Sequence, residues 1–371
     1  MKIYLATIIV LIIVLYICLF KEQQEDFTNI KAPCRIPTLL KQVIKEYKMD
    51  NNISSKEWEY FIPCEYNSCE NKVKEFEKDP IRRKLFLIDG CDNPASKIEL
   101  WSILKKYYGK DKASNLMPTT HLLTDKKELN EFKIHFENKN KKKSGHMFVL
   151  KNYAQRQEGI KLSRDLDEIL EAHKDGWYLV QDYLYKPFLV NKRKVNFRYY
   201  TLIVCKNDEV HGYIHRNGFV YYTPEFYNEN DMDFKKHITT GYIDRKVYDE
   251  NPLTLDDFRN HLDKIQPGLS KKWDQNVKDL MNNVITALAP TICKNKKLSH
   301  HIRFQIFGSD VAPTDDLSAY LMEINKGPDL NAKDDRDKQV KLGMQKDIFK
   351  VIENNIINGI YYSDSRFEKI Y

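Results

Sequence analysis

The chain has 371 residues, a formal net charge of +7 and an aromatic content of 12%. This length supplies enough apolar material for two or three packed units, and the aromatic content excludes a disordered protein. The positive charge is modest and gathers in short runs such as residues 139–143, and the chain has no motif that contacts nucleic-acid bases, so we expect no nucleic-acid partner. The basic runs could instead attract an acidic partner.

The first predicted element is a membrane anchor. The segment from Ile3 to Phe20 contains no charged residue and is rich in Ile, Leu and Val. It is just long enough to cross a bilayer as a helix, and no small-residue cleavage site follows it. We therefore expect residues 1–25 to be a retained, single-pass signal anchor. Lys2 and Lys21 flank the segment almost symmetrically, so the charges leave the orientation open, and a cytosolic body is the default.

The chain contains seven cysteines, at positions 18, 34, 64, 69, 91, 205 and 293. Cys64 and Cys69 form the one close pair, and no second pair or histidine stands at zinc-finger spacing. We expect reduced thiols in a cytosol-like compartment. A Cys64–Cys69 disulfide, or one that involves Cys34, is the alternative if the body is lumenal.

Two α/β units are expected after a short linker at residues 26–32. In the first, helical stretches between residues 37 and 108 alternate with an apolar run at residues 84–89, which is typical of a buried strand. A helix is expected at residues 125–136, followed by a basic loop. In the second unit, strands are expected at residues 146–151 and 177–183, and the spacing of Leu162, Leu166, Ile169 and Leu170 predicts a helix between them.

The C-terminal half begins with a long predicted strand at residues 194–204. Residues 213–222 are its expected hairpin partner, with a bend at Asn217–Gly218. Helices are predicted at residues 273–288 and 339–356. Between these helices, residues 303–310 and 319–325 are expected to form a hairpin whose loop is centred near Asp316.

This last hairpin carries the most informative polar residues. Its register places Asp310 opposite Glu323, and Asn325, two residues on, shares their face. Two facing carboxylates repel each other unless something positive lies between them. Two carboxylates and an amide oxygen form a hard site that suits magnesium beside substrate phosphates. The alternative, a solvated sheet face with scattered charges, fits poorly with the apolar flanking residues.

Further polar residues indicate a nucleotide site. Lys151 ends a strand before a polar loop, where a lysine can reach phosphates that the loop amides cover, although a surface lysine is the alternative. Gln181 and Tyr183 share one face of the next strand, whose edge could offer backbone groups to an adenine ring; an amphipathic strand is the alternative. The segment 237–240 adds a weaker indication, because most such segments are polar loops.

The strand at residues 194–204 begins with three polar residues on one face. Lys194, Asn196 and Arg198 alternate with apolar residues. Two cations and an amide on one strand face are unfavourable unless they meet solvent or an anion.

Taken in order, these segments resemble the tubulin–tyrosine ligase-like family, a branch of the ATP-grasp ligases. The matching pieces occur in the family's order and at nearly its spacing. They lie at residues 117–120, 148–151, 157–160, 181–183 with 187–189, 194–198, 237–240, 307–310 and 322–325. The resemblance implies an α/β ATP-grasp fold that holds the nucleotide between two α/β subdomains, behind a transmembrane helix and a small α/β domain. The expected divisions are residues 1–25 for the anchor, 26–114 for the linker and N-terminal α/β domain, 115–185 for the central subdomain and 186–371 for the C-terminal subdomain with the metal site.

The resemblance also implies a role for each site residue. Lys194 and Arg198 would be catalytic, with Arg198 at the γ-phosphate or at an acyl-phosphate. Two magnesium ions would be held by Asp310, Glu323 and Asn325. The nucleotide would contact Lys151, Arg156, Gly159, Gln181, Tyr183, Lys194, Asn196 and Thr239.

The implied reaction is ATP-driven ligation. A carboxylate attacks the γ-phosphate to give an acyl-phosphate, and an amine then displaces phosphate to form an amide. The implied substrates are a free amino acid and an acidic protein or peptide acceptor such as a tubulin tail. A small-molecule carboxylate–amine ligase is one alternative. A pseudo-enzyme that acts as a membrane-anchored binding protein is another.

Several positions depart from the family pattern. Gln157 stands where glycine is general, in a loop that is one residue shorter, and Asn196 and Thr240 replace Asp and Asn. Tyr221 stands near the place of a family arginine. Loss of that arginine removes a bidentate contact to carboxylate or phosphate, which puts the identity of the amino acid in doubt more than ATP binding.

Overall fold

The computed structural model describes residues 28–32, 36–47, 49–51, 59–63, 69–152, 159–359 and 365–371. The predicted anchor and Arg156 lie outside these ranges, so both stay predictions. Among the helices within the described ranges, none is both long and apolar enough to cross a bilayer.

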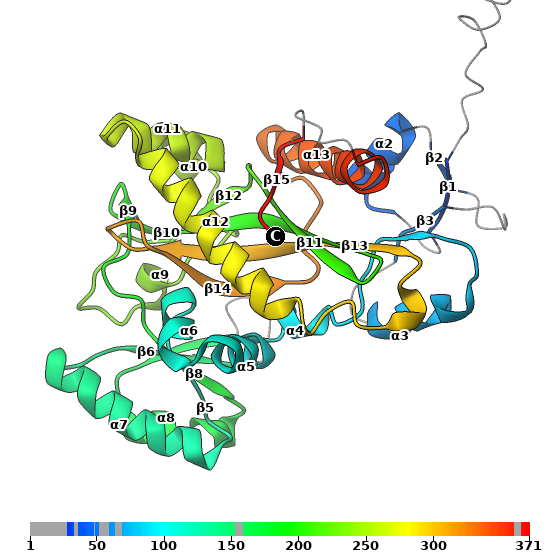
Figure 1. Ribbon diagram of the computed structural model, residues 1–371. Coiled ribbons are helices and arrows are strands. Elements are labelled where there is room, and N and C mark those ends of the chain that lie inside the picture. Colours follow the sequence, from blue (N-terminus) through cyan, green and yellow to red (C-terminus); the bar gives the residue numbers. More distant parts are fainter. Residues whose placement is uncertain are drawn as a thin grey trace, which may run out of the picture.

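The described chain is a mixed α/β protein built on two sheets (Figure 1). The large sheet has 11 strands, in the order β15-β11-β10-β13-β4-β3-β1-β2 with β9, β12 and β14 paired beside β10 or β13, and the small sheet has the order β5-β8-β6-β7. The strands are β1 (Thr28–Lys31), β2 (Met49–Asn51), β3 (Tyr60–Phe61), β4 (Lys84–Leu85), β5 (Thr120–Leu122), β6 (Phe148–Lys151), β7 (Ile160–Ser163), β8 (Leu179–Asp182), β9 (Leu189–Val190), β10 (Arg193–Lys206), β11 (Glu209–His215), β12 (Phe219–Tyr222), β13 (Ile302–Pro313), β14 (Ala319–Asn325) and β15 (Phe367–Lys369).

Helices flank both sheets. In Figure 1, α12 crosses the strands of the large sheet, α2 lies beside α13, and α7 and α8 lie with the small sheet. We call the large sheet with its helices the large lobe, and the small sheet with α7 and α8 the small lobe. The helices are α2 (Thr38–Glu46), α3 (Cys69–Lys74), α4 (Asp92–Ala95), α5 (Lys97–Tyr108), α6 (Lys110–Leu116), α7 (Lys126–Lys142), α8 (Leu166–Glu171), α9 (Phe234–His237), α10 (Val247–Glu250), α11 (Leu255–Ile265), α12 (Leu269–Leu288) and α13 (Asp335–Lys350), which continues as a π-helix over Val351–Ile357.

The large sheet joins residues that the sequence analysis assigned to separate domains. Strands β1 and β3 pair in parallel, β3 pairs with β4, and β4 pairs with β13 of the C-terminal half. The predicted buried strand at residues 84–89 is confirmed at its start by β4, and the residues that follow are buried. The N-terminal strands thus extend the sheet that carries the polar hairpin.

The pairing of β10 with β13 forms the centre of this sheet. It is antiparallel and runs from the pair Phe197–Val311 to the pair Cys205–Arg303. On one face of β10, Phe197 packs against Trp273 of α12, and the indole Nε1 of Trp273 donates a hydrogen bond of 2.9 Å to the hydroxyl of Tyr199. Because side chains alternate along a strand, the polar residues 194, 196 and 198 point to the opposite face.

The predicted hairpin of β13 and β14 is confirmed, including its register. Asp310 pairs with Glu323, and Gly308 pairs with Asn325. In the turn, the carboxylate of Asp316 accepts hydrogen bonds from the Thr314 hydroxyl and the Ser318 amide. The register shifts between Asp310 and Val311, which leaves Met322 unpaired in a β-bulge.

Two local predictions are wrong. The basic run at residues 139–143 is not a loop, because α7 continues to Lys142; cations are favourable in the last turn of a helix. Leu162 does not belong to the predicted helix but lies in β7. That helix, α8, begins only after Asp165, whose side chain accepts a hydrogen bond from the amide of Glu168 and so sets its start.

The expectation of reduced thiols is wrong for two described cysteines. Cys205, in β10, and Cys293, after α12, form a disulfide between positions 88 residues apart in the sequence. Both are buried, and the amide of Cys293 donates a hydrogen bond to the carbonyl of Asp89. The alternatives with Cys34 or Cys64 fall outside the described residues. A separation this long gives no sequence pattern that would identify the pair.

Breaking this disulfide is expected to destabilise the large lobe. Because it closes a long loop, replacing both cysteines (Cys205→Ala with Cys293→Ala) should lower the free energy of unfolding by about 2–5 kcal/mol, measured by urea denaturation. A reductant should lower the urea midpoint of the wild type and leave that of the double variant unchanged. An equal response of the two proteins to reductant would contradict the disulfide.

Gly218 is required where β12 approaches β10. A Cβ atom at this position would lie 2.1 Å from the carbonyl oxygen of Arg198. We expect Gly218→Ala to lower the free energy of unfolding by about 2–4 kcal/mol, measured in the same way. Gly343→Ala is the matched control, because its Cβ meets nothing within 4 Å in α13, and it should raise stability by about 0.5–1 kcal/mol. Equal stability of the two variants would contradict the close approach.

Candidate active site

Two buried lysines meet between the lobes. The Nζ of Lys151, at the end of β6, donates a hydrogen bond of 3.3 Å to the carbonyl of Met322, which the β-bulge leaves outside the ladder. The Nζ of Lys194, in β10, donates one of 3.3 Å to the hydroxyl of Tyr183. Burial lowers the pKa of Lys151 to about 8, and burial together with the charge of Lys151 lowers the pKa of Lys194 to about 7. No carboxylate of the described residues forms an ion pair with either, so the two ammonium groups favour an added anion.

A hydrogen-bonded chain orients Lys194. The Nε2 of His237 lies 2.9 Å from the carbonyl of Asp231, to which it must donate, so Nδ1 is left as the acceptor. The hydroxyl of Tyr183 lies 2.8 Å from that Nδ1 and donates to it. The Tyr183 oxygen is then free to accept from Lys194. Burial lowers the pKa of His237, which favours the neutral ring that this chain needs.

Beside the lysines, Gln181 holds an unused acceptor. Its Nε2 donates hydrogen bonds of 2.9 Å to the Thr120 hydroxyl and 3.3 Å to the Pro118 carbonyl. Its Oε1 is buried and has no partner within the described residues. A small apolar cluster lies on the same face of the sheet. It contains Met147, Val149 and Tyr183, with Ile160 and Leu162 packed against it. An apolar wall with a single buried acceptor fits a flat base that carries an amino group.

The hairpin carboxylates lie opposite these cations. Arg198 binds Asp310 through two contacts, Nε to Oδ1 at 2.5 Å and Nη2 to Oδ2 at 3.0 Å. The Nδ2 of Asn325 donates a hydrogen bond of 3.2 Å to Oε1 of Glu323. Burial raises the pKa of Asp310 to about 6 despite Arg198. Burial also acts to raise the pKa of Glu323, but the nearby lysines, Lys151 first, outweigh it and the pKa is lowered. Cations of the protein therefore already relieve the repulsion between the two carboxylates.

The residues present fit magnesium in part. Across the described ranges there is no group of three or more His, Cys, Asp or Glu side chains placed to hold a metal. The hairpin offers two carboxylates and one amide, which suits an ion that keeps waters and shares its shell with phosphate oxygens. Asp310 would have to exchange its contact with Arg198 for the cation. That exchange would free the guanidinium of Arg198 for an anionic substrate.

One lysine beside the site, Lys97, was not predicted from the sequence. It is the first residue of α5, and its Nζ donates a hydrogen bond of 3.1 Å to the carbonyl of Asn152, next to Lys151. Its charge lowers the pKa of both Lys151 and Glu323. An isolated lysine far from the other motifs carries no pattern that would single it out. The structure thus adds a third cation, from the N-terminal part of the chain.

Tyr221 covers the guanidinium of Arg198. The two groups are 5.4 Å apart, measured from Cζ to the ring centroid. Tyr221 pairs across the strands with Asn196, whose buried Oδ1 has no partner within the described part of the chain. Burial raises the pKa of Tyr221 to about 12, so its hydroxyl stays neutral. Tyr221 therefore presents a neutral aromatic ring to Arg198.

The remaining predicted residues lie at the margins of this group. Gly159 is buried, and its carbonyl accepts a hydrogen bond from the amide of Asn152 beside Lys151. Thr239 precedes Thr240, whose amide donates to the carbonyl of Tyr222 in β12. The structure thus gathers Lys151, Lys194, Arg198, Asp310, Glu323 and Asn325, with Gln181 and Tyr183 beside them.

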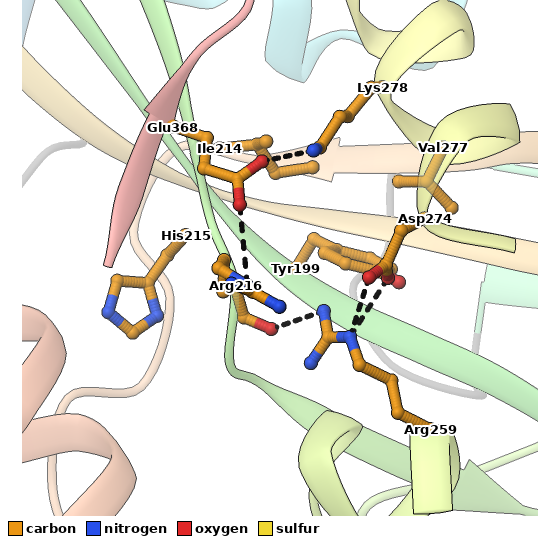
Figure 2. Close-up of a pocket in the computed structure, with 9 residues that line it drawn as sticks. All are labelled: Tyr199, Ile214, His215, Arg216, Arg259, Asp274, Val277, Lys278 and Glu368. Carbon is orange, nitrogen blue, oxygen red and sulfur yellow. Dashed lines mark hydrogen bonds and ion pairs between the residues drawn. The ribbon is translucent and has the colours of Figure 1, made fainter. Parts of the chain in front are cut away.

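A second concave site lies on the opposite face of the large sheet. Figure 2 shows Arg259 bound to Asp274, and Glu368 bound to both Lys278 and Arg216. It is lined by Tyr199, Ile214, His215, Arg216, Arg259, Asp274, Val277, Lys278 and Glu368. These Arg and Lys cations already have carboxylate partners, in contrast to Lys151 and Lys194. This pocket is therefore a weaker candidate for an anionic ligand.

The fold and this cationic site match a known class of protein. The tubulin-tyrosine ligase family matches residues 93–358, well over half of the chain. The mixed α/β architecture with two sheets agrees with the ATP-grasp type of fold that this family has. The chain therefore belongs to the tubulin-tyrosine ligase family.

Individual relatives are distant. The chain is 22% identical over 223 residues to "Tubulin glycylase 3B" of Drosophila melanogaster, a match that covers 56% of this chain and 29% of that protein. It is 26% identical over 277 residues to "Probable beta-tubulin polyglutamylase" of Tetrahymena thermophila, a match that covers 65% of this chain and 22% of that protein. It is 23% identical over 360 residues to "Probable tubulin polyglutamylase ttll-9" of Caenorhabditis elegans, a match that covers 90% of this chain and 82% of that protein. The chain thus spans less than a third of the length of the first two relatives.

The lysine pKa values predict how nucleotide binding depends on pH. A bound polyphosphate stabilises the charged form of Lys194 and Lys151, so binding raises both pKa values from about 7 and about 8. ATP affinity should be greatest below pH 7 and fall as the pH rises to 9, and binding at pH 8 should take up about one proton. Calorimetry in two buffers of different ionisation enthalpy measures the uptake. Lys194→Met should lose most of it; pH-independent binding without proton uptake would contradict the assignment.

Proposed function

We propose that this protein is an ATP-dependent ligase that joins an amino acid to a protein or peptide through an acyl-phosphate intermediate. The observation that carries this proposal is the pair of buried lysines, Lys151 and Lys194, which form no direct ion pair within the described chain and face a carboxylate hairpin. Burial of ammonium groups without a direct ion pair is costly, so such a pair favours a phosphate-rich ligand. Membership of the tubulin-tyrosine ligase family supports the same proposal.

The proposed roles follow from the contacts. Lys151, Lys194 and Lys97 would hold the phosphates, and the Oε1 of Gln181 would accept from the base. Asp310, Glu323 and Asn325 would hold two magnesium ions, which would neutralise charge on phosphate oxygens. Arg198, once released from Asp310, would bind the carboxylate or acyl-phosphate side of the reaction. Catalysis would then rest on position and charge, without a Ser or Cys nucleophile.

The acceptor is proposed to be an acidic protein segment, because the relatives named above are a tubulin glycylase and probable tubulin polyglutamylases. A membrane anchor at residues 1–25 and a cytosolic body, where ATP is abundant, complete the proposal. The Cys205–Cys293 disulfide is then an exception among cytosolic proteins, in which structural disulfides are rare.

One observation favours a second candidate function. Tyr221 covers Arg198 where a family arginine is expected, and Arg198 is itself bound to Asp310. A binding protein that holds nucleotide without turnover would tolerate this arrangement. The two buried lysines fit both functions, so turnover decides between them.

The hairpin carboxylates give the direct test of metal-dependent turnover. Asp310→Asn and Glu323→Gln remove one charge each and keep the shape, so both should lower magnesium-dependent ATP turnover by at least about a hundredfold while the fold survives. Asp315→Asn, in the exposed turn of the same hairpin, is the matched control and should retain activity. Unchanged turnover in Glu323→Gln would exclude the metal assignment.

The products of the reaction identify both substrates. The protein is incubated with ATP, magnesium, a panel of amino acids and acidic acceptor peptides, and the peptides are weighed by mass spectrometry. A fixed mass increment that requires ATP would identify the amino acid. Tight ATP binding with no increment and no phosphate release across the panel would contradict the ligase and favour the binding protein.

A further inference from the structure

Helix α7 presents an exposed basic surface on the small lobe. Its other side is buried, with Phe132 in the core of the small lobe and Leu129 and Phe136 packed against it. The opposite half of the helix is exposed. We call the lysines of this half the basic face of α7. They are Lys126, Lys127, Lys133, Lys141 and Lys142.

The charges of the basic face are not balanced by the protein. Other lysines nearby are paired: Lys139 with Asp182, Lys143 with Glu229, and Lys105 with Glu128. By contrast, the five lysines of the basic face form no ion pair with any residue that the structure describes. The acids exposed beside them are Glu137 and Asp125, and Asp125 already caps the helix.

The helix dipole favours Lys141 and Lys142, which lie in the last turn of α7, but it does not account for the other lysines of the basic face. Lys126 and Lys127 lie in the first turn of α7, where the helix dipole disfavours cations. Ile134 lies in the exposed half of the helix and is 63% exposed. An apolar side chain among unpaired cations suits a ligand that combines carboxylates with aliphatic stems, as an acidic peptide does.

The position of α7 bears on the kind of partner. Figure 1 shows α7 at the opposite end of the molecule from β1, the first described strand. A membrane held through residues before β1 would therefore lie far from the basic face. The exposed half of α7 also carries no aromatic residue on which nucleic-acid bases could stack. Both points favour a protein partner.

The end of α7 leads towards the site between the lobes. Lys143 directly follows the helix and forms an ion pair with Glu229, and the Nη2 of Arg164 donates a hydrogen bond of 3.1 Å to the carbonyl of Glu229. Glu229 precedes His237 in the chain, and the Nδ1 of His237 accepts a hydrogen bond from Tyr183. A bound peptide that lies along α7 would thus pass the end of the helix where the small lobe meets the large lobe.

We propose that the basic face of α7 is a docking surface for an acidic protein segment. This inference rests on the proposed ligase function in one respect, which is that the docked segment belongs to the acceptor. Docking there would hold an acidic acceptor by charge, next to the site and without occupying it.

The test is a binding measurement on the full chain. A fluorescent peptide of ten glutamates is titrated with wild-type protein, and anisotropy gives the affinity at several salt concentrations. Charge reversal of four lysines (Lys126→Glu, Lys133→Glu, Lys141→Glu and Lys142→Glu) should weaken binding by at least about tenfold at low salt, and the difference should shrink as salt screens the charges.

The control carries the same change in net charge elsewhere. Lys41, Lys45, Lys264 and Lys271 are exposed lysines of α2, α11 and α12 that form no ion pair in the described chain. Their reversal to Glu should change the affinity by less than about threefold. Equal losses in the two variants would overturn the proposal, because net charge alone would then explain the binding. A stronger loss of binding to phosphatidylserine vesicles or to single-stranded DNA than to the peptide would overturn it too.

ATP binding separates this proposal from the proposed function. The α7 variant should bind ATP as the wild type does, since its substitutions lie outside the site. Peptide binding lost with ATP binding retained supports docking, whether or not ligation is found. Loss of ATP binding in the α7 variant would overturn the proposal, because the substitutions would then act by disturbing the lobe.

Discussion

The ion pair between Arg198 and Asp310 sets the arrangement of the whole site. It crosses the central pairing of β10 with β13 and brings together a guanidinium and a carboxylate that are both largely shielded from water. Removing two charges from water costs several kcal/mol per ion, and two parallel contacts recover only part of that cost. Replacing such a pair by apolar residues is often neutral or stabilising, so stability alone gives no reason to keep it. The pair makes better sense as a resting arrangement that a metal ion and an anionic substrate would both disrupt.

Three further cations lie in or beside this site. Lys151, Lys194 and Lys97 come from three separate parts of the chain, and each is oriented by an uncharged oxygen: a bulge carbonyl, a tyrosine hydroxyl and a loop carbonyl. For Lys151 and Lys194, the neutral partner positions the ammonium group without cancelling its charge. The site therefore keeps a surplus of positive charge on one side and two carboxylates on the other, which is the division that phosphate transfer needs.

The sequence predicts features that depend on local alternation and misses those that depend on distant contacts. The register of Asp310 with Glu323 follows from a short polar turn between two alternating strands, and it is confirmed. The predicted end of the helix that became α7 was wrong because lysine is favourable in a final helical turn. The predicted place of Leu162 was wrong because the helical spacing of apolar residues does not reveal that Asp165 caps α8. Lys97 and the Cys205–Cys293 disulfide could not be predicted, since each joins segments that share no sequence pattern. The roles of the site residues stay predictions until they are tested.

The bulge at Met322 has a consequence for how this region can change during evolution. Asp310 and Glu323 lie on the side of the bulge away from the turn, so residues 314–318 can lengthen or shorten without moving the two carboxylates relative to each other. A deletion of Met322 itself would restore regular alternation and withdraw the carbonyl that Lys151 contacts. Insertions and deletions should therefore be tolerated in the turn of this hairpin and eliminated at Met322.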